Sequence, residues 1–168
     1  MEEPIVIEEY DPTWSAKFEA EKHALKQALT GRFVAIEHIG STAVPGLPSK
    51  PIIDIMVAVT QLEAGELYAR LLEPLGYLYK PDSSNEQSDR LFLRKGTPRS
   101  HHLHIVIKGS AEQKRHLAFR DYLLAHPETV TEYAALKLEL AQKYRLDREA
   151  YTNAKTAFIT DIERKAGE

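Results

Sequence analysis

Residues 33–59, FVAIEHIGSTAVPGLPSKPIIDIMVAV, decide the fold of this chain. They predict a strand over residues 33–39, a glycine-rich loop, and a second strand over residues 51–59. The second run is apolar except for Asp54. A carboxylate is costly to bury unless a partner neutralises it. Asp54 is therefore the first candidate functional residue, and we expect a metal ion or a basic group beside it.

Length and composition limit the class of protein. The chain has 168 residues, of which 43% are hydrophobic and 28% charged, as in one soluble globular domain. It has no cysteine, which excludes disulfides and thiolate metal sites and favours the cytoplasm. The net charge of −3 argues against non-specific binding to nucleic acid. The sequence predicts no membrane segment, and its acidic start is not typical of a signal peptide.

Ahead of the opening stretch, the sequence predicts a short strand and a helix. The apolar residues 5–7 indicate an edge or lead-in strand, which could pair with a second copy in a homodimer. Asp11-Pro12 is a typical helix start, with Asp11 as the N-cap and Pro12 at the first helical position. Apolar side chains then recur at helical spacing until Gly31.

After residue 59 the sequence predicts a helix followed by antiparallel strands. Thr60 and Glu63 have the spacing of a capping box, and the helix is expected to end near residues 74–76. The polar residues 81–89 are expected to form a mobile loop. Three short strands are expected around this loop, at residues 77–79, 90–94 and 102–107.

The end of the chain is expected to be helical. Ser110 and Gln113 indicate a second capping box, and helices are predicted at about residues 111–126, 128–144 and from 148 onward. A sheet segment followed by helices predicts an α+β fold. We expect one domain over residues 1–168, with an α/β sheet lobe (1–109) and a helical C-terminal lobe (110–168).

Four blocks of this sequence resemble the GrpB family. They are EHIGSTAVPGLPSKPIIDIMVAV (37–59), HHLHIV (101–106), RHLAFRDYLLAHPETVTEYAALK (115–137) and DREAYTNAKTAFI (147–159). The resemblance covers nearly the whole chain. It implies a nucleotidyltransferase-like fold, with a mixed or antiparallel sheet flanked by helices. Related domains occur fused to dephospho-CoA kinases.

The resemblance also implies where the site lies. Members of the nucleotidyltransferase superfamily bind phosphates at a Gly-Ser loop, and carboxylates on the next strands hold two divalent ions. This assigns Gly40, Ser41 and Thr42 to phosphate binding and Asp54 to catalysis. Met56 stands where the second carboxylate is expected, and its thioether is a poor ligand for Mg²⁺.

Two histidines occupy the strand that would supply the third carboxylate. His102 and His104 are two residues apart and therefore share one strand face. Imidazole suits Zn, Mn or Ni better than Mg²⁺. The predicted metal ligands are Asp54, His102 and His104, and the expected cofactor is a divalent ion, Mg²⁺ or Mn²⁺ with Zn²⁺ as the alternative. The simpler alternatives are sheet histidines with ordinary hydrogen bonds, and an Asp54 paired with Lys50 or an arginine.

Four further residues are candidates for nucleotide or phosphate binding: Lys50, Arg120, Tyr151 and Lys155. Tyr151 and Lys155 are four residues apart and share one helix face. A lysine or tyrosine of the helical lobe reaches the triphosphate in related nucleotidyltransferases, and the resemblance gives Lys155 that role. The alternatives are an ordinary helix-surface lysine at Lys155 and a Lys50 that only steadies its loop.

Two functions remain open from the sequence. One is metal-dependent transfer of a nucleoside monophosphate from an NTP to an unknown acceptor. The alternative is a non-catalytic nucleotide- or coenzyme A-binding or scaffold module with a degenerate site, which Met56 favours. A weaker third hypothesis is a metal-dependent hydrolase that uses the two histidines, for which the sequence shows no convincing water-activating base.

Overall fold

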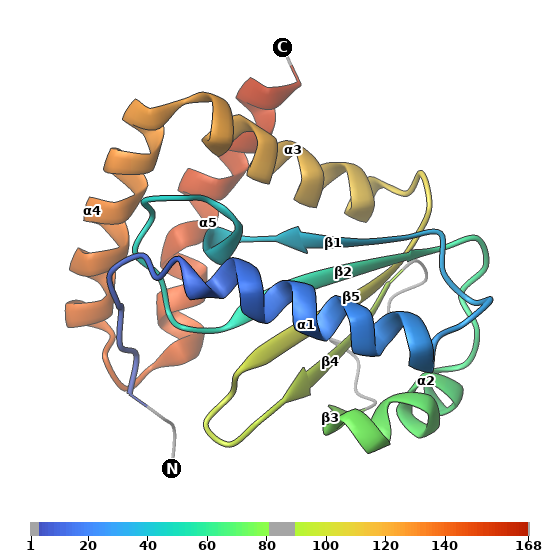
Figure 1. Ribbon diagram of the computed structural model, residues 1–168. Helices are drawn as coiled ribbons and strands as arrows, with labels where there is room; N and C mark the ends of the chain where they lie inside the picture. Colours follow the sequence, from blue (N-terminus) through green and yellow to red (C-terminus); the bar gives the residue numbers. More distant parts are fainter. Residues whose placement is uncertain (1–3, 81–89, 168) are drawn as a thin grey trace.

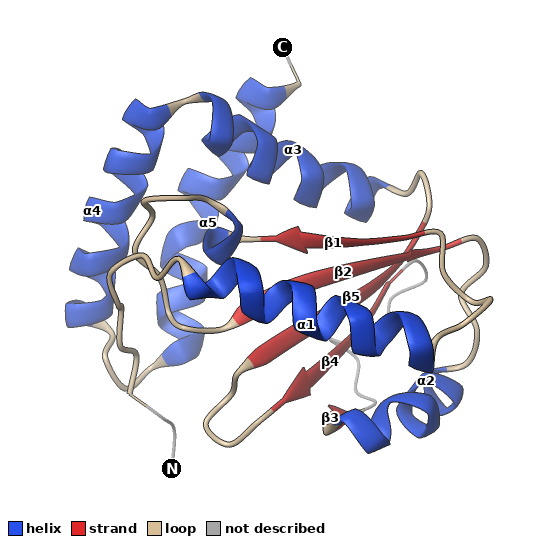
Figure 2. Cartoon of the chain, viewed as in Figure 1, coloured by secondary structure: helices blue, strands red, loops and turns tan. Residues whose placement is uncertain are grey.

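A five-stranded mixed sheet forms the centre of the computed structural model, which describes residues 4–80 and 90–167 (Figures 1 and 2). The spatial order of the strands is β1-β2-β5-β4-β3, and β2 and β5 run parallel while the other neighbours run antiparallel. The α+β class and the mixed sheet are confirmed. The strand bounds are β1 (Ala35–Ile39), β2 (Ile53–Val59), β3 (Tyr77–Tyr79), β4 (Arg90–Lys95) and β5 (His101–Ile107).

The described residues also form five α-helices. These are α1 (Thr13–Ala28), α2 (Gly65–Leu72), α3 (Ala111–Ala125), α4 (Pro127–Lys143) and α5 (Arg148–Ala166). α1 lies across the front of the sheet in Figure 1, α3 runs along the β1 edge, and α4 and α5 stand at one end of the strands. No helix among them is both long and apolar enough to cross a membrane.

The two faces of the sheet have different roles. The odd-numbered residues of β2 join Trp14 and Phe18 of α1 and Tyr68 of α2 in the main hydrophobic core. The even-numbered residues point to the opposite face, because side chains alternate along a strand. Since β5 is parallel to β2, His102 lies opposite Asp54 in the register. The sheet therefore brings the predicted histidines and Asp54 to one face.

Side-chain caps explain where two of the helices begin. The Thr13 amide donates to the Asp11 carboxylate at 2.9 Å. The Gln113 amide donates to the Ser110 hydroxyl at 3.3 Å. Each bond satisfies a backbone N–H group that lacks a partner within the helix. The start predicted at residue 110 is confirmed, with Ser110 as the N-cap. The prediction of Asp11 as the N-cap and Pro12 as the first helical residue is one position early: Pro12 is the N-cap and α1 begins at Thr13, although the Asp11 carboxylate still accepts from the Thr13 amide.

The capping box predicted from Thr60 to Glu63 is wrong. α2 begins only at Gly65, and its N-cap residue, Ala64, has no side chain that can accept a hydrogen bond. The Glu63 carboxylate instead pairs with the Arg32 guanidinium at 2.6 Å. The Glu63 carboxylate, which the local pattern assigned to the helix start, therefore forms a long-range ion pair with Arg32.

The edge strand predicted at residues 5–7 is also wrong. Residues 5–7 form no strand, and an isolated bridge lies just after them, between Glu8 and Ser49. Ile5 is buried against α4 and α5, and its amide donates to the Arg145 carbonyl at 2.7 Å. The segment thus packs on the helices instead of offering a strand edge. A homodimer stays a prediction, but residues 5–7 do not supply a strand that could pair with a second copy. The loop predicted at 81–89 lies outside the described residues.

Candidate functional site

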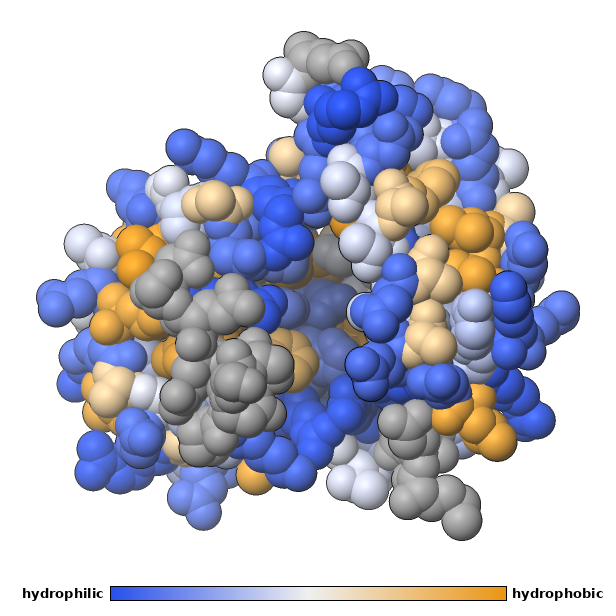
Figure 3. Space-filling view, turned by 180° about the vertical axis from the view of Figure 1, so that it is seen from behind, coloured by the Kyte–Doolittle hydropathy of each residue, from blue (hydrophilic) through white to orange (hydrophobic). Residues whose placement is uncertain are grey.

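A cavity of about 220 Å³ lies between the sheet and helices α3, α4 and α5. Seen from behind, the molecule is hollowed between its sheet side and its helical side, and mostly hydrophilic side chains surround the hollow (Figure 3). The cavity wall includes five of the residues that the sequence predicted for the site: Gly40, Ser41, Asp54, His104 and Lys155. The fold therefore gathers residues from β2, β5, α5 and the loop after β1 at one place.

Asp54 is held by two histidines. His102 Nδ1 and His104 Nε2 lie 3.5 and 3.6 Å from the same oxygen, Asp54 Oδ1. Burial works to raise the pKa of Asp54, but hydrogen bonds from the two imidazoles outweigh it and hold that pKa well below its usual range. Asp54 is therefore an anion at neutral pH, although only 30% of its side chain is exposed.

Each of the two histidine rings faces Asp54 with one nitrogen. Burial lowers the pKa of His102, and the Asp54 carboxylate only partly opposes this. Phe92 packs against both rings, with centroid distances of 5.1 Å to His102 and 5.2 Å to His104. We assign the proton of each ring to the nitrogen that faces Asp54, because only a protonated nitrogen can donate to the carboxylate. The opposite nitrogens, His102 Nε2 and His104 Nδ1, are buried without a hydrogen-bond partner.

The donors around Asp54 do not fit a two-metal carboxylate site. Met56, at the position of the second carboxylate, is fully buried and packs with Ile39. Within residues 4–80 and 90–167, no group of three or more His, Asp or Glu side chains is arranged to hold a metal ion. The predicted ligands Asp54, His102 and His104 do lie together. Their use as metal ligands stays a prediction.

The glycine-rich loop passes directly over the Asp54 carboxylate. Gly40 has φ +71°, and a Cβ at this position would lie 2.7 Å from Asp54 Oδ2. Only glycine fits both the backbone angle and the close approach. Ser41 follows in the cavity wall. Thr42 is buried, and its hydroxyl is hydrogen-bonded to His38 Nε2 at 2.8 Å, so its side chain does not line the cavity.

Two of the predicted cations flank a buried tyrosine. The Nζ atoms of Lys155 and Lys50 lie 4.4 and 5.1 Å from the centroid of the Tyr151 ring. Burial lowers the pKa of Lys155 to about 8, although the Asp54 charge opposes the shift. Burial and the nearby charge of Lys155 lower the pKa of Lys50 to about 7. The shared helix face of Tyr151 and Lys155 is confirmed, and Lys155 lines the cavity whereas Lys50 and Tyr151 do not.

A third lysine, Lys137, is missing from the sequence prediction. Its side chain is only 2% exposed, and its Nζ lies 5.1 Å from the centroid of the Tyr133 ring. Burial, together with the charges of Lys155 and Lys50, holds the pKa of Lys137 well below its ordinary value. A signal was present in the sequence, because a lysine four residues after Tyr133 and three before Leu140 interrupts the apolar stripe of a helix.

The three lysines share one electrostatic property. None of Lys50, Lys137 and Lys155 forms an ion pair or a side-chain hydrogen bond with another residue that the structure describes. Asp54 is the carboxylate whose charge acts on the pKa of all three. The charge of Asp54, which already has two histidine partners, therefore acts on one buried and two partly buried amines.

Arg120 lies outside the cavity wall. Its Nη1 donates to Glu37 Oε2 at 2.7 Å and to the His38 carbonyl at 3.1 Å, and its Nε donates to Asp121 Oδ1 at 2.9 Å. The bonds to Glu37 and His38 fasten α3 to β1, whereas the bond to Asp121 lies within α3. Phosphate binding by Arg120 stays a prediction, because its side chain already has two carboxylate partners.

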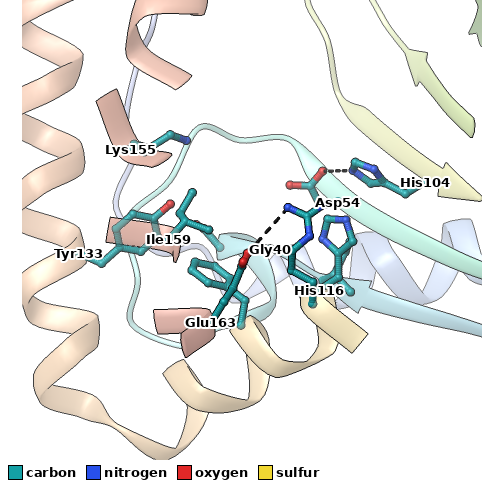
Figure 4. A pocket seen from close by; sticks show the side chains of 12 residues that line it. Gly40, Asp54, His104, His116, Tyr133, Lys155, Ile159 and Glu163 are labelled. Carbon is teal, nitrogen blue, oxygen red and sulfur yellow. Dashed lines mark ion pairs between the residues drawn. The ribbon is translucent and has the colours of Figure 1, made fainter. Parts of the chain in front are cut away.

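Helices α3 and α5 add charged groups that the sequence prediction did not include. Arg115 and Glu163 lie 3.8 Å apart in the cavity wall, and the His116 and His104 rings have a centroid distance of 4.9 Å (Figure 4). Burial lowers the pKa of His116 to about 4. No local pattern indicates these residues, because they meet only where α3 and α5 pack together.

Comparisons with known proteins agree with this fold. A sequence model of the family described as GrpB protein matches residues 4–165. The UPF0157 protein PA4798 of Pseudomonas aeruginosa is 41% identical over 157 residues, and a dephospho-CoA kinase of Mycolicibacterium paratuberculosis is 31% identical over 190 residues. The aligned parts are 90% and 97% of this chain, but only 63% and 46% of those two proteins.

A solved structure is similar over almost the full length. The crystal structure of the conserved protein GrpB from Enterococcus faecalis has a TM-score of 0.88 and 43% sequence identity to this chain, and the alignment covers 96% of each chain. The similarity therefore extends to the sheet, the helices and their relative placement.

Proposed function

The chain belongs to the GrpB family, and from this premise we propose that it binds a phosphorylated small molecule, a nucleotide or a coenzyme A derivative, in the cavity around Asp54. The observation that carries the proposal is a set of three lysines, of which Lys137 is buried and Lys50 and Lys155 are partly buried. Lys50, Lys137 and Lys155 have lowered pKa values because burial disfavours their charged forms. An anionic ligand would supply the counter-charge that the described residues do not.

The geometry matches a chain of phosphate groups. Lys155 reaches the cavity from α5 (Figure 4), and Gly40 and Ser41 of the loop after β1 also line it. Phosphate oxygens accept hydrogen bonds from ammonium groups, hydroxyls and loop amides. The similarity to dephospho-CoA kinases adds coenzyme A derivatives to the nucleotides as candidates for the ligand.

A second candidate function is the transfer of a nucleoside monophosphate from an NTP to an acceptor. It is favoured by the meeting of Ser41, Asp54 and Lys155 in one cavity. Asp54, with His102 or His104, would hold a single divalent ion, Mg²⁺, Mn²⁺ or Zn²⁺, which would supply charge neutralisation at the phosphates. Met56 argues against a second ion, so binding without turnover is the better supported function.

A thermal-shift screen tests the two candidates together. The ligands are pyrophosphate, ATP, the other NTPs, coenzyme A and dephospho-coenzyme A, each alone and with Mg²⁺, Mn²⁺ or Zn²⁺. The variants are Lys155→Met, Asp54→Ala and, as the matched control on α5, Lys165→Met. A ligand at a hundredfold excess over its Kd stabilises the folded state by about 2.7 kcal/mol.

The outcomes separate the hypotheses. A shift that needs no metal and is lost in Lys155→Met but kept in Lys165→Met supports phosphate binding. A shift that requires a divalent ion and disappears in Asp54→Ala supports the transfer reaction and justifies a search for the acceptor. No shift with any of these ligands, or an equal shift in all variants, overturns both.

A further inference from the structure

A second cavity, of about 330 Å³, begins at Lys50 and lies outside the site described above. Four separate parts of the chain form its wall: the first described residues, the segment that leads into β2, the turn between β4 and β5, and the start of α5. The apolar part of the wall consists of Pro4, Val6, Pro51, Ile52 and Pro98. Such a site suits a compact apolar group.

The charged part of the same wall is entirely cationic. Lys50, Arg99 and Arg148 line the cavity, and among the described residues no acidic side chain lines it. The charges of Arg148 and Arg99 add to burial in lowering the pKa of Lys50, so each guanidinium lies close enough to disfavour the charged form of Lys50. An anionic group placed between them would relieve this repulsion.

Lys50 connects the two cavities. Its Nζ lies over the Tyr151 ring, and Lys155, which lines the first cavity, lies over the same ring. A row of cations therefore runs from the apolar cavity, past Tyr151, to the cavity at Asp54. A ligand whose anionic end lies at Lys50 would place that end beside the proposed phosphate site.

We propose that this second cavity binds an organic anion with a compact apolar body, such as an aromatic or short aliphatic carboxylate. The anionic group lies among Lys50, Arg99 and Arg148, and the body packs against the prolines, Val6 and Ile52. The cations of the wall favour an anionic group, and the apolar part of the wall favours an apolar body, so together they select this class of ligand. The inference goes beyond phosphate binding, because the cavity can take its ligand whether or not the first cavity holds a phosphate.

The probe for the test is 2-naphthoate, which joins a flat apolar body to a carboxylate, and 2-naphthamide is its uncharged partner. Titration calorimetry on the wild-type protein should show that naphthoate binds at least about tenfold more tightly than naphthamide, because only the anion meets the cations. Equal affinities for the two compounds would overturn the cationic part of the proposal.

Val6→Asp tests the position of the ligand. It places a negative charge in the cavity wall at a residue that is 52% exposed, so the fold should tolerate it. The matched control is Val34→Asp, which changes a valine of 45% exposure outside this wall. Val6→Asp should weaken naphthoate binding by at least about tenfold, and Val34→Asp should leave it unchanged. Equal affinity in the two variants would place the ligand elsewhere and overturn the proposal.

A second pair of variants keeps the proposal falsifiable if Val6→Asp disturbs the fold. Arg148→Gln removes one wall cation, whereas Arg145→Gln removes an exposed cation outside the wall. Only Arg148→Gln should weaken naphthoate binding. The thermal shift with pyrophosphate should persist in Val6→Asp, so failure of this inference and failure of phosphate binding are distinguishable.

Discussion

Asp54 shows how neighbouring side chains set the state of a single residue. Its carboxylate stays charged because the His102 and His104 imidazoles donate hydrogen bonds to it, and the loop at Gly40 passes over its second oxygen. The three lysines near it have the opposite problem, since burial disfavours their charge. Burying these lysines therefore lowers the folding stability of the protein, and such a cost is typical of a binding site.

Lys137→Met should stabilise the protein and weaken anion binding at the same time. The buried amine costs folding free energy, and methionine has a similar length without the charge, so we expect a gain of about 1 to 3 kcal/mol. The measurement is urea unfolding of the unliganded protein, followed by titration with pyrophosphate.

The control for this variant is Lys143→Met, an exposed lysine on the same helix. It should change unfolding by less than about 0.5 kcal/mol and leave binding unchanged. A loss of stability in Lys137→Met would contradict the prediction, because it would show that the amine has a favourable partner in the folded protein.

Gly40→Ala should destabilise the protein more than Gly46→Ala. Both glycines have positive φ, +71° and +85°, so both variants carry the backbone cost of about 1 kcal/mol. Only Gly40 also meets an obstacle, Asp54 Oδ2 at 2.7 Å, whereas nothing lies within 4 Å of the Gly46 position. Thermal unfolding should therefore show an additional loss of about 1 kcal/mol or more for Gly40→Ala. Equal losses would mean that the loop moves away from Asp54 at no cost.

At the level of secondary structure, the pairing of β2 with β5 determines which side chains lie next to Asp54. Parallel pairing places residue 102 beside residue 54 and residue 104 beside residue 56. A shift of one residue in this register would turn the histidines into the apolar core. On β5, polar and apolar residues alternate from His102 to Ile105, and this alternation opposes that shift, so the core side of the sheet fixes the geometry of the functional side.

Helix α2 offers a test of what a missing cap costs. Its N-cap residue, Ala64, has extended backbone angles but no side-chain acceptor. Ala64→Ser should supply one and stabilise the protein by about 0.5 to 1 kcal/mol, measured as a higher urea midpoint. Ala69→Ser, in the interior of the same helix, is the control and should be neutral or slightly destabilising. A lower midpoint for Ala64→Ser would show that the helix start is held in a different way.

The whole molecule should become more stable as pH rises from about 7 to about 9.5. The pKa values of Lys50 and Lys155 are about 7 and about 8 in the folded protein, against an ordinary value of 10.5. The unfolded chain therefore binds more protons in this interval, and stability rises with pH wherever that is true. Urea unfolding of the unliganded protein at three pH values measures the effect.

Anion binding should change in the opposite direction over the same interval. A phosphate group prefers the protonated amines, so its affinity should fall as Lys50 and Lys155 lose their protons. In the double variant Lys50→Met/Lys155→Met both trends should be reduced. An affinity for ATP that is constant from pH 7.5 to 9.5 would show that these amines do not contact the ligand.

Much of this protein follows from its sequence by itself. Alternating and helical apolar periods, together with caps at Asp11 and Ser110, predicted the elements because such signals act between residues close in the chain. The strand spacing of His102 and His104, and the isolated Asp54, likewise indicated the site. The two local predictions that are wrong, at residues 5–7 and at Thr60, concern segments with weak periodicity, where contacts with Arg145 and Arg32 prevail.

Only the tertiary structure decided how the charges meet. Lys50 precedes β2, Lys137 lies on α4 and Lys155 on α5, and no spacing within the chain relates them. The same holds for the second cavity, whose wall comes from four separate segments. The physical reason is that a periodic pattern specifies which face of an element is buried, whereas the free energy of a buried charge depends on every group packed around it, and these groups are set by how the elements pack.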